Sequence, residues 1–147
     1  MSERLSEHFT LHEAVRSATA KRQGIDNVPD AVELERLRAT AQRMERIRAL
    51  LGNRPVVVTS WFRCEALNAA VGGVPDSAHR LGYAVDFVCP SYGTPLNIAR
   101  RLVAARVAFD QLIYEYGRWV HVSFDPQMRG EVLTAMPSGY ERGLVED

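Results

Sequence analysis

The stretch SAHRLGYAVDFV, residues 77–88, decides the fold because it joins a turn-forming region to a strand that must be buried. Its second half, YAVDFV, has the β-branched and aromatic residues typical of a strand, yet Asp86 stands in the middle of it. A carboxylate in that position is costly to bury unless it is paired or bound to a metal ion. His79 precedes Asp86 by seven residues, at the loop that enters the strand. These two residues are therefore a candidate functional pair, although this spacing alone arises readily by chance.

A second informative stretch is FDQLIYEYGRWVHVSF, residues 109–124, in which two strand-like runs flank a turn at residues 117–118. The pattern predicts a β-hairpin. In its second run, Trp119, His121 and Ser123 alternate onto one face. A histidine and an aspartate from one segment, joined by His121 from a distant strand, would give three ligands and one open position, the pattern of a catalytic zinc site. The residues alone leave open a generic α+β domain in which both histidines pack in the core beside a structural aspartate.

Elsewhere the periodicity predicts helices early in the chain and a mixture of strands and helices later. Helices are expected over residues 11–20, 31–51, 65–71 and 94–107, and a further strand over residues 55–62. Thr10 and Glu13 form a capping box at the start of the first helix. This order favours one α+β domain over residues 1–147, in which residues 1–54 are mainly helical and residues 55–135 are strand-rich.

Composition excludes several classes of function. Eighteen basic and eighteen acidic residues give a formal net charge of zero, whereas a nucleic-acid-binding protein usually has a basic excess. No apolar run approaches the roughly 20 residues that span a bilayer, so membrane insertion is not expected. The start, MSERLSEHFT, lacks the apolar core of a signal peptide, and we expect a monomeric chain that stays in the cytoplasm of the producing cell. Cys64 and Cys89 are too few for a disulfide framework and are expected to be free thiols, with a single bridge left open.

The run VTSWFRCEALNAAVGGVPDSAHRLGYAVDF, residues 58–87, together with the hairpin stretch resembles the zinc peptidases that cleave bacterial cell-wall peptides. These are the D-alanyl-D-alanine carboxypeptidases, the related dipeptidases and the phage L-alanyl-D-glutamate endopeptidases, which share the zinc fold of the Hedgehog signalling domain. The resemblance extends from about Leu5 to Leu133 and is closest to the small single-domain members of phages and prophages. It implies a small antiparallel sheet that carries the zinc site, with helices packed against the sheet.

Position by position, the resemblance implies that His79, Asp86 and His121 bind one zinc ion per chain. It also implies that Ser77 contacts the substrate or orients the site, and that Arg63 holds a substrate carboxylate or stabilises the oxyanion. The planar, permanently charged guanidinium of arginine suits either task.

Several further residues are expected to have structural roles. Asn68 and the glycines at residues 72–73 match the family pattern and are expected to shape the loop that presents the zinc-binding histidine. Four aromatic residues are expected to line the core or the groove, and one of them could donate to the oxyanion: Tyr83, Tyr114, Tyr116 and Trp119.

The chain departs from the family at the general base. Many relatives have an acidic residue three positions before the last zinc histidine, where this chain has Arg118. The nearest upstream carboxylate is Glu115, six positions before His121. In an idealised two-residue hairpin Glu115 faces away from His121, whereas a wider or bulged turn places Glu115 on the same face as His121. Asp110 and Asp125 are weaker candidates.

The resemblance therefore implies a zinc metallopeptidase that hydrolyses peptide bonds of peptidoglycan stem peptides, and we expect Glu115 to be its general base. Both a D-Ala-D-Ala carboxypeptidase and an endolysin-type endopeptidase fit, and an endolysin would reach the cell wall only after release from the cell. The alternative is a catalytically silent zinc-binding domain with a cell-wall-binding or phage structural role, which the departure at Arg118 favours.

Overall fold

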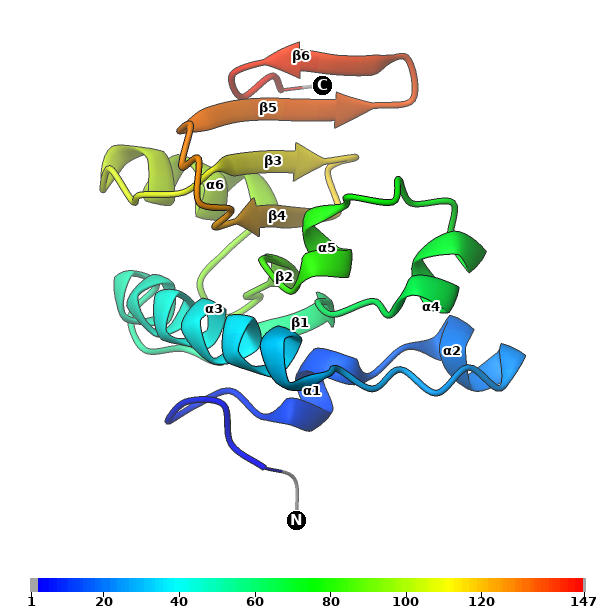
Figure 1. The fold of residues 1–147 in the computed structure, drawn as a ribbon. Helices are drawn as coiled ribbons and strands as arrows, with labels where there is room; N and C mark the ends of the chain where they lie inside the picture. Colours follow the sequence, from blue (N-terminus) through cyan, green and yellow to red (C-terminus); the bar gives the residue numbers. More distant parts are fainter. Residues whose placement is uncertain (1–2, 147) are drawn as a thin grey trace. The chain divides into compact units, whose positions relative to one another are not determined.

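The computed structural model describes residues 3–146 as six helices and six strands, arranged as shown in Figure 1. The helices are α1 (Leu11–Val15), α2 (Ala18–Gln23), α3 (Ala31–Leu50), α4 (Glu65–Ala70), α5 (Ala78–Leu81) and α6 (Pro95–Ala104). The strands are β1 (Val57–Ser60), β2 (Ala84–Val88), β3 (Gln111–Glu115), β4 (Trp119–Ser123), β5 (Glu131–Met136) and β6 (Gly139–Arg142). The predicted α+β class is confirmed.

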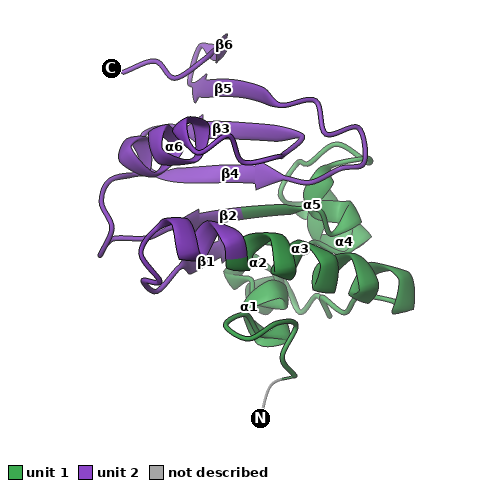
Figure 2. Ribbon diagram, turned by 90° about the vertical axis from the view of Figure 1, so that its left-hand side faces the viewer, with its two compact units in different colours: residues 1–45, 60–85 green, residues 46–59, 86–147 purple. Residues whose placement is uncertain are grey.

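The chain forms two compact units, each assembled from two segments (Figure 2). The first unit combines Met1–Glu45 with Ser60–Val85 and contains α1, α2, α4 and α5. The second combines Arg46–Thr59 with Asp86–Asp147 and contains α6 and nearly all of the sheet. The expectation of one domain over the whole chain stays a prediction.

The first unit begins with two short helices where the sequence predicts one. The capping box at the start of α1 is present, since Thr10 and Glu13 each accept a hydrogen bond from the backbone of the other. The helix stops at Val15 because Ser17 caps a new one: its hydroxyl accepts a hydrogen bond from the backbone N–H of Ala20 at 3.2 Å. A serine that caps a helix has an extended backbone, so Ser17 cannot lie in the interior of a helix. The single helix predicted over residues 11–20 is therefore wrong.

The long helix α3 follows the predicted stripe of apolar residues. Its buried side chains recur at helical spacing and are completely shielded from solvent: Leu37, Ala41, Met44 and Ile47. The chain leaves the helix at Gly52, whose backbone is left-handed with φ at 80°. This conformation favours glycine, so the predicted end of the helix is confirmed to within two residues.

The sheet has the strand order β1-β2-β4-β3-β5-β6. Strands β3 and β4 are antiparallel, as are β5 and β6, in keeping with the expected antiparallel sheet. The sheet as a whole is mixed, however, because β3 and β5 run parallel. Helix α6 packs against β3 and β4, and the apolar side chains of Leu112, Val120 and Val122 in these two strands are completely buried.

The predicted hairpin is confirmed, with a longer turn than the sequence suggests. Three residues, Tyr116, Gly117 and Arg118, connect β3 to β4, so Glu115 pairs with Trp119. Tyr116 and Gly117 are both left-handed, with φ of 55° and 69°. The turn is closed by a hydrogen bond of 2.9 Å from the Arg118 N–H to the Glu115 carbonyl.

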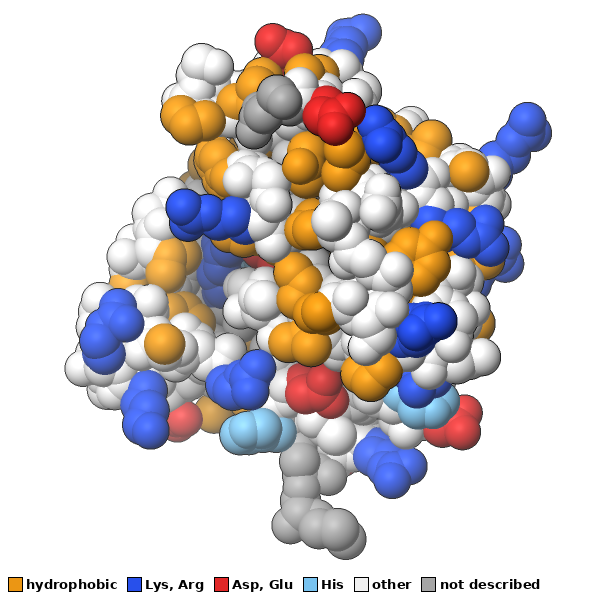
Figure 3. Space-filling model, turned by 180° about the vertical axis from the view of Figure 1, so that it is seen from behind, with side chains coloured by type: hydrophobic (Ala, Val, Ile, Leu, Met, Phe, Trp, Pro, Cys, Tyr) orange, Lys and Arg blue, Asp and Glu red, His pale blue; other side chains and the backbone are white. Residues whose placement is uncertain are grey.

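No helix within residues 3–146 is long and apolar enough to cross a membrane. On the face shown in Figure 3, arginine and lysine side chains are dispersed among hydrophobic and uncharged ones.

Candidate metal centre and active site

His79 is buried, with 4% of its surface exposed, and belongs to the single turn of helix α5. The helix begins at Ser77, whose hydroxyl accepts a hydrogen bond of 3.3 Å from the His79 N–H. The Nδ1 atom of the ring donates to the carbonyl oxygen of Trp61 at 2.7 Å. A carbonyl can only accept, so the ring carries its proton on Nδ1, and Nε2 is the nitrogen with a lone pair for a metal ion.

The segment that follows β1 is joined to His79 a second time. The backbone N–H of Arg63 donates to the carbonyl of His79 at 3.1 Å. Trp61 and Arg63, which lie two residues apart, therefore both bind His79. Trp61 binds its side chain, and Arg63 binds its backbone. The position of this segment therefore sets both the orientation of His79 and the place where the Arg63 side chain begins.

Asn27 fixes this segment from the N-terminal part of the chain. Its amide nitrogen donates to the carbonyls of Val15 and Phe62, both at 2.9 Å, and its oxygen accepts from the Cys64 N–H at 2.7 Å. Asn27 is 8% exposed, so these bonds satisfy a buried amide. No local signal in the sequence connects this asparagine to Phe62, 35 residues away.

The guanidinium of Arg63 is positioned by a neighbouring helix and a glycine. Its Nη1 lies 3.4 Å from Oδ1 of Asn68, whose amide nitrogen in turn donates to the Val74 carbonyl at 2.7 Å. A Cβ atom at Gly73 would lie 2.1 Å from that same Asn68 oxygen and 3.2 Å from the Arg63 Nη1. Glycine is therefore required here for close packing, and the predicted loop-shaping residues also hold the arginine.

Asp86 and His121 form a buried pair, with 6% and 8% of their surfaces exposed. The His121 Nδ1 donates to Oδ1 of Asp86 at 2.8 Å. Asp86 extends from β2, where its neighbours Val85 and Phe87 are completely buried. The pairing answers the question raised by the sequence, because a carboxylate in an apolar strand needs a hydrogen-bonded partner.

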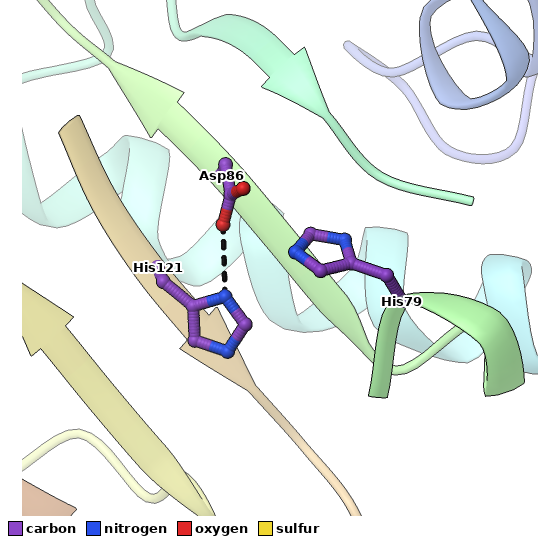
Figure 4. Close-up of side chains that lie close together, drawn as sticks. All are labelled: His79, Asp86 and His121. Atoms are coloured by element: carbon purple, nitrogen blue, oxygen red, sulfur yellow. Dashed lines mark hydrogen bonds and ion pairs between the residues drawn. The ribbon is translucent and has the colours of Figure 1, made fainter. Parts of the chain in front are cut away.

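The three predicted ligands come together. Ligand atoms of His79, Asp86 and His121 all lie within 4.8 Å of one another, and all three residues are buried (Figure 4). Two imidazole nitrogens and one carboxylate oxygen are ligands that zinc prefers, and three protein ligands leave a position open for water or substrate. The donor set and the carbonyl bond that fixes the tautomer of His79 both fit a zinc ion.

Glu115 lies beside this group. The three-residue turn pairs Ile113 with His121 and Glu115 with Trp119, so the side chains of Glu115 and His121 lie on the same face of the sheet. The Oε1 of Glu115 is 3.5 Å from Nδ1 of His121. Of the two arrangements considered from the sequence, the wider turn is therefore the one that occurs.

Asp110 has a structural role. Its carboxylate accepts hydrogen bonds from the backbone N–H, Nε and Nη2 of Arg129 at 3.0, 2.8 and 2.8 Å. The side-chain bonds from Arg129 hold the pKa of Asp110 below its usual range. This aspartate joins the start of β3 to the segment before β5 and is not available as a general base. Asp125, the other alternative, is not part of the metal-ligand group.

Tyr140 is an aromatic residue that sequence reasoning did not consider. In the register of the sheet, Ala135 pairs with Glu115 on one side and with Tyr140 on the other, so all three share a face. Burial raises the pKa of the Tyr140 phenol, and the negative charge of Glu115 contributes to the effect. Tyr140 therefore keeps its proton near this carboxylate. No pattern in the sequence paired β5 with β3, so nothing there could have indicated it.

The remaining candidates lie outside this chemistry. His8 is exposed and pairs with Glu45 through a contact of 2.7 Å. Cys64 and Cys89 are both free thiols. Tyr83 contacts the guanidinium of Arg36, which lies 5.3 Å from the centre of its ring.

Comparison with known proteins agrees with this arrangement. A family model described as Peptidase M15 matches residues 7–123, a range that contains Arg63, Glu115 and the whole metal-ligand group. No curated protein matches the chain.

Proposed function

This chain belongs to the peptidase M15 family of zinc-dependent peptidases, and we propose that it hydrolyses peptide bonds in the stem peptides of bacterial peptidoglycan. One observation supports the proposal above the others. A carboxylate, Glu115, is 3.5 Å from His121 of the buried metal-ligand group, although this chain has no acidic residue at the family's usual position.

His79, Asp86 and His121 would hold the zinc ion. When bound, zinc polarises a scissile carbonyl and lowers the pKa of water to about 7. The carbonyl of Trp61 keeps the proton of His79 on Nδ1 and so directs Nε2 toward the metal. A histidine nitrogen binds a metal ion only after it has lost its proton. If the His121 ligand atom is Nδ1, metal binding would therefore release the proton that Nδ1 now donates to Asp86.

Glu115 is the general base in this proposal. Its Oε1 accepts a proton from the attacking water and afterwards returns that proton to the nitrogen of the leaving amine. The side chain is 17% exposed, so it is largely shielded and still accessible to a water molecule.

Arg63 is the group that binds the negative charge of the substrate, either a carboxylate or the oxyanion that develops during hydrolysis. Its contact with Asn68 orients the guanidinium before substrate arrives. A pocket of about 350 Å³ lies beside this pair and is lined in part by Asn68, Gly73 and Arg80. The lining also includes Glu65, and the guanidinium of Arg80 is paired with Glu33, so Arg63 is the cation that this proposal assigns to the substrate.

The second candidate is a zinc-binding domain without catalytic activity, with a cell-wall-binding or phage structural role. The observation that favours it is Arg118, a residue that cannot take a proton at neutral pH, at the position where many relatives have an acid. The two candidates agree on the metal and differ on cleavage.

Zinc content is the first test of both. We expect one zinc ion per chain in the purified protein by elemental mass spectrometry, and loss of zinc in His79→Ala and in Asp86→Ala. His8→Ala is the matched control, since this histidine pairs with Glu45 and should leave the zinc content unchanged. Absence of zinc from the folded wild-type protein would contradict both candidates.

Cleavage decides between them. Purified muropeptides and a synthetic stem pentapeptide are incubated with the zinc-loaded protein, and the products are weighed by mass spectrometry. Loss of a terminal alanine identifies a carboxypeptidase, whereas internal fragments identify an endopeptidase. Full zinc occupancy with no product from any of these substrates would leave the silent domain as the function.

A further inference from the structure

A pocket of about 690 Å³ lies at the turn end of the β3–β4 hairpin, within the second compact unit. Its walls come from the ends of β3, β4 and β5 and from the two turns that follow β3 and β5. The lining residues are Tyr114, Tyr116, Gly117, Arg118, Trp119, Thr134, Ala135, Met136, Pro137 and Ser138. The known chemistry of the zinc group assigns no role to this pocket.

The pocket adjoins the proposed base. Glu115 lies between Tyr114 and Tyr116 in the chain, and its register partners in the neighbouring strands are Trp119 and Ala135. Trp119 and Ala135 share the face of Glu115 and line the pocket, whereas the lining residues Tyr114 and Thr134 pair with each other on the opposite face. The pocket therefore lies at the turn end of the sheet, and a peptide whose scissile bond is next to Glu115 reaches it by extending past the turn.

The chemistry of the walls is aromatic with one positive charge. The rings of Tyr116 and Trp119 meet edge to face, with centroids 5.9 Å apart, and can pack on an aliphatic stem. Arg118 is exposed and is the one charged residue among the described residues that line the pocket. The buried Nε1–H of Trp119 has no acceptor among residues 3–146. A buried donor without a partner is uncommon in folded proteins and is often satisfied by a ligand or a water molecule.

Arg118 is also held in place by its backbone. Its N–H is bonded to the Glu115 carbonyl at 2.9 Å, and the N–H of Tyr116 donates to the Ala135 carbonyl of β5 at 3.0 Å. These two bonds fix the backbone of the turn to β3 and to β5, so the exposed Arg118 side chain extends from a defined point of the backbone beside the pocket.

We propose that this pocket binds a carboxylate-bearing residue of the peptide substrate, with the aromatic rings packed on its aliphatic part and Arg118 paired with its carboxylate. The inference rests on the proposed peptidase function and names the side chain that the enzyme selects. The proposal also accounts for the departure from the family. Many relatives have an acid at this position, whereas this chain has Arg118, which would bind the substrate carboxylate.

Cleavage kinetics test the proposal with matched substrates. Stem peptides are prepared in which each side-chain carboxylate in turn is replaced by a carboxamide, and kcat/KM is measured for each. The wild-type protein should lose about tenfold in kcat/KM for one of these replacements, the size of effect expected for a hydrogen bond to a charged group. Arg118→Gln should cleave that acid and amide pair equally, and Arg118→Lys should keep much of the preference. Arg46→Gln removes an exposed arginine from α3 and should keep the wild-type ratio.

An unchanged acid preference in Arg118→Gln would overturn the proposal, as would a wild-type protein that cleaves every amide as well as its acid. Arg118 is exposed, so its variants are expected to fold.

A binding measurement separates this proposal from the proposed function. The chain has two tryptophans, and the indole N–H signal of Trp119 is followed by NMR, with that of Trp61 as an internal reference. The probes are N-acetylglutamate, its side-chain amide N-acetylglutamine, and N-acetylglucosamine as a sugar. We expect the Trp119 signal to shift with the acid, to shift less with the amide, and to lose its response to the acid in Arg118→Gln.

A response to the sugar alone, or to none of the three probes, would overturn the carboxylate pocket. A protein that responds to the acid and cleaves no stem peptide would keep the pocket and lose the proposed function. Cleavage of stem peptides without any acid preference would keep the proposed function and overturn the carboxylate pocket.

Discussion

His79 and residues 61–64 are held by hydrogen bonds from distant parts of the first unit, whereas Glu115 owes its position to the register of one hairpin. Asn27 alone makes two bonds to the backbone of residues 61–64, at Phe62 and Cys64, and a third to Val15. Glu115 instead shares a face with His121 because its strand pairs through a three-residue turn. His79, a predicted metal ligand, is thus fixed by several contacts that each contribute a little, whereas the proposed base is fixed by the register of one strand pair.

The difference suggests that the two regions fail in different ways. A lost contact near His79 should lower stability and leave the chemistry of the hairpin unchanged. A change at Glu115 should abolish turnover and leave the fold and the metal unchanged. Four substitutions test this contrast.

Glu115→Gln should have the largest effect. Removing a positioned general base lowers kcat by about 10²–10⁴-fold. Zinc content should remain at the wild-type level, because Glu115 is not one of the three grouped ligands. Steady-state cleavage of a stem peptide and elemental analysis give the two values. Glu141→Gln, an exposed change on β6, is the control, and a Glu115→Gln protein with wild-type kcat would assign the base to another residue.

Asn27→Ala should be the most destabilising change on the His79 side. Two carbonyls and one N–H would lose their partner in a largely buried place, at a cost of about 3 kcal/mol in the free energy of unfolding. Urea denaturation followed by circular dichroism measures it. Gln42→Ala, at an exposed position of α3, should change this free energy by no more than about 0.5 kcal/mol. An equal, small effect of both changes would show that the asparagine is dispensable.

Gly73→Ala should cost about 2 kcal/mol, because the new Cβ would overlap Asn68 and something must shift. The displaced Asn68 would also release the guanidinium of Arg63, so KM should rise while zinc content is unchanged. The double variant Gly73→Ala with Asn68→Ala removes the obstructing side chain. If overlap is the cause, the two changes together should destabilise by less than the sum of the single changes. If the two free-energy changes are strictly additive, overlap with Asn68 is not the cause of the destabilisation.

Asp110→Asn should have the smallest of the four effects, about 1.5 kcal/mol for the loss of a charge-assisted interaction. The folded pKa of Asp110 is lowered, so the stability from this group is present above the unfolded pKa, near 4, and is lost as the pH falls through the folded value. Wild-type stability should therefore decline on acidification more steeply than that of the variant. Parallel curves for the two proteins across this range would refute the assignment.

The strands could be predicted from the sequence because their signals are local, whereas the set of metal ligands was implied by the resemblance to the zinc peptidases. Asp86 interrupts an apolar run, and His121 alternates with its neighbours along a strand, so each residue reports its own environment. The short helix at His79 and the break between α1 and α2 were missed, since Ser77 and Ser17 cap helices of only a few residues. A single serine is a weak signal at that length.

The remaining parts of the site depend on contacts that no local pattern reveals. The turn length depends on the bond from Tyr116 to Ala135 in β5, and β5 pairs with β3 in parallel without any marker in the sequence. Likewise the role of Asp110 became clear only from its partner Arg129, 19 residues further on. These features follow from tertiary structure, which selects one of several local conformations of similar free energy.

The pairing of β3 with β4 also bears on how such sites are recognised in a sequence. Residues that face one another across a hairpin are separated along the chain by an amount that depends on their distance from the turn. A carboxylate on the partner strand can therefore face the same histidine at different intervals in the sequence, depending on the length of the turn. A signature written with one fixed interval would exclude this chain, in which Glu115 stands six residues before His121 and still faces it. The face of the sheet on which a side chain lies, and not a fixed interval along the chain, decides whether it can reach His121.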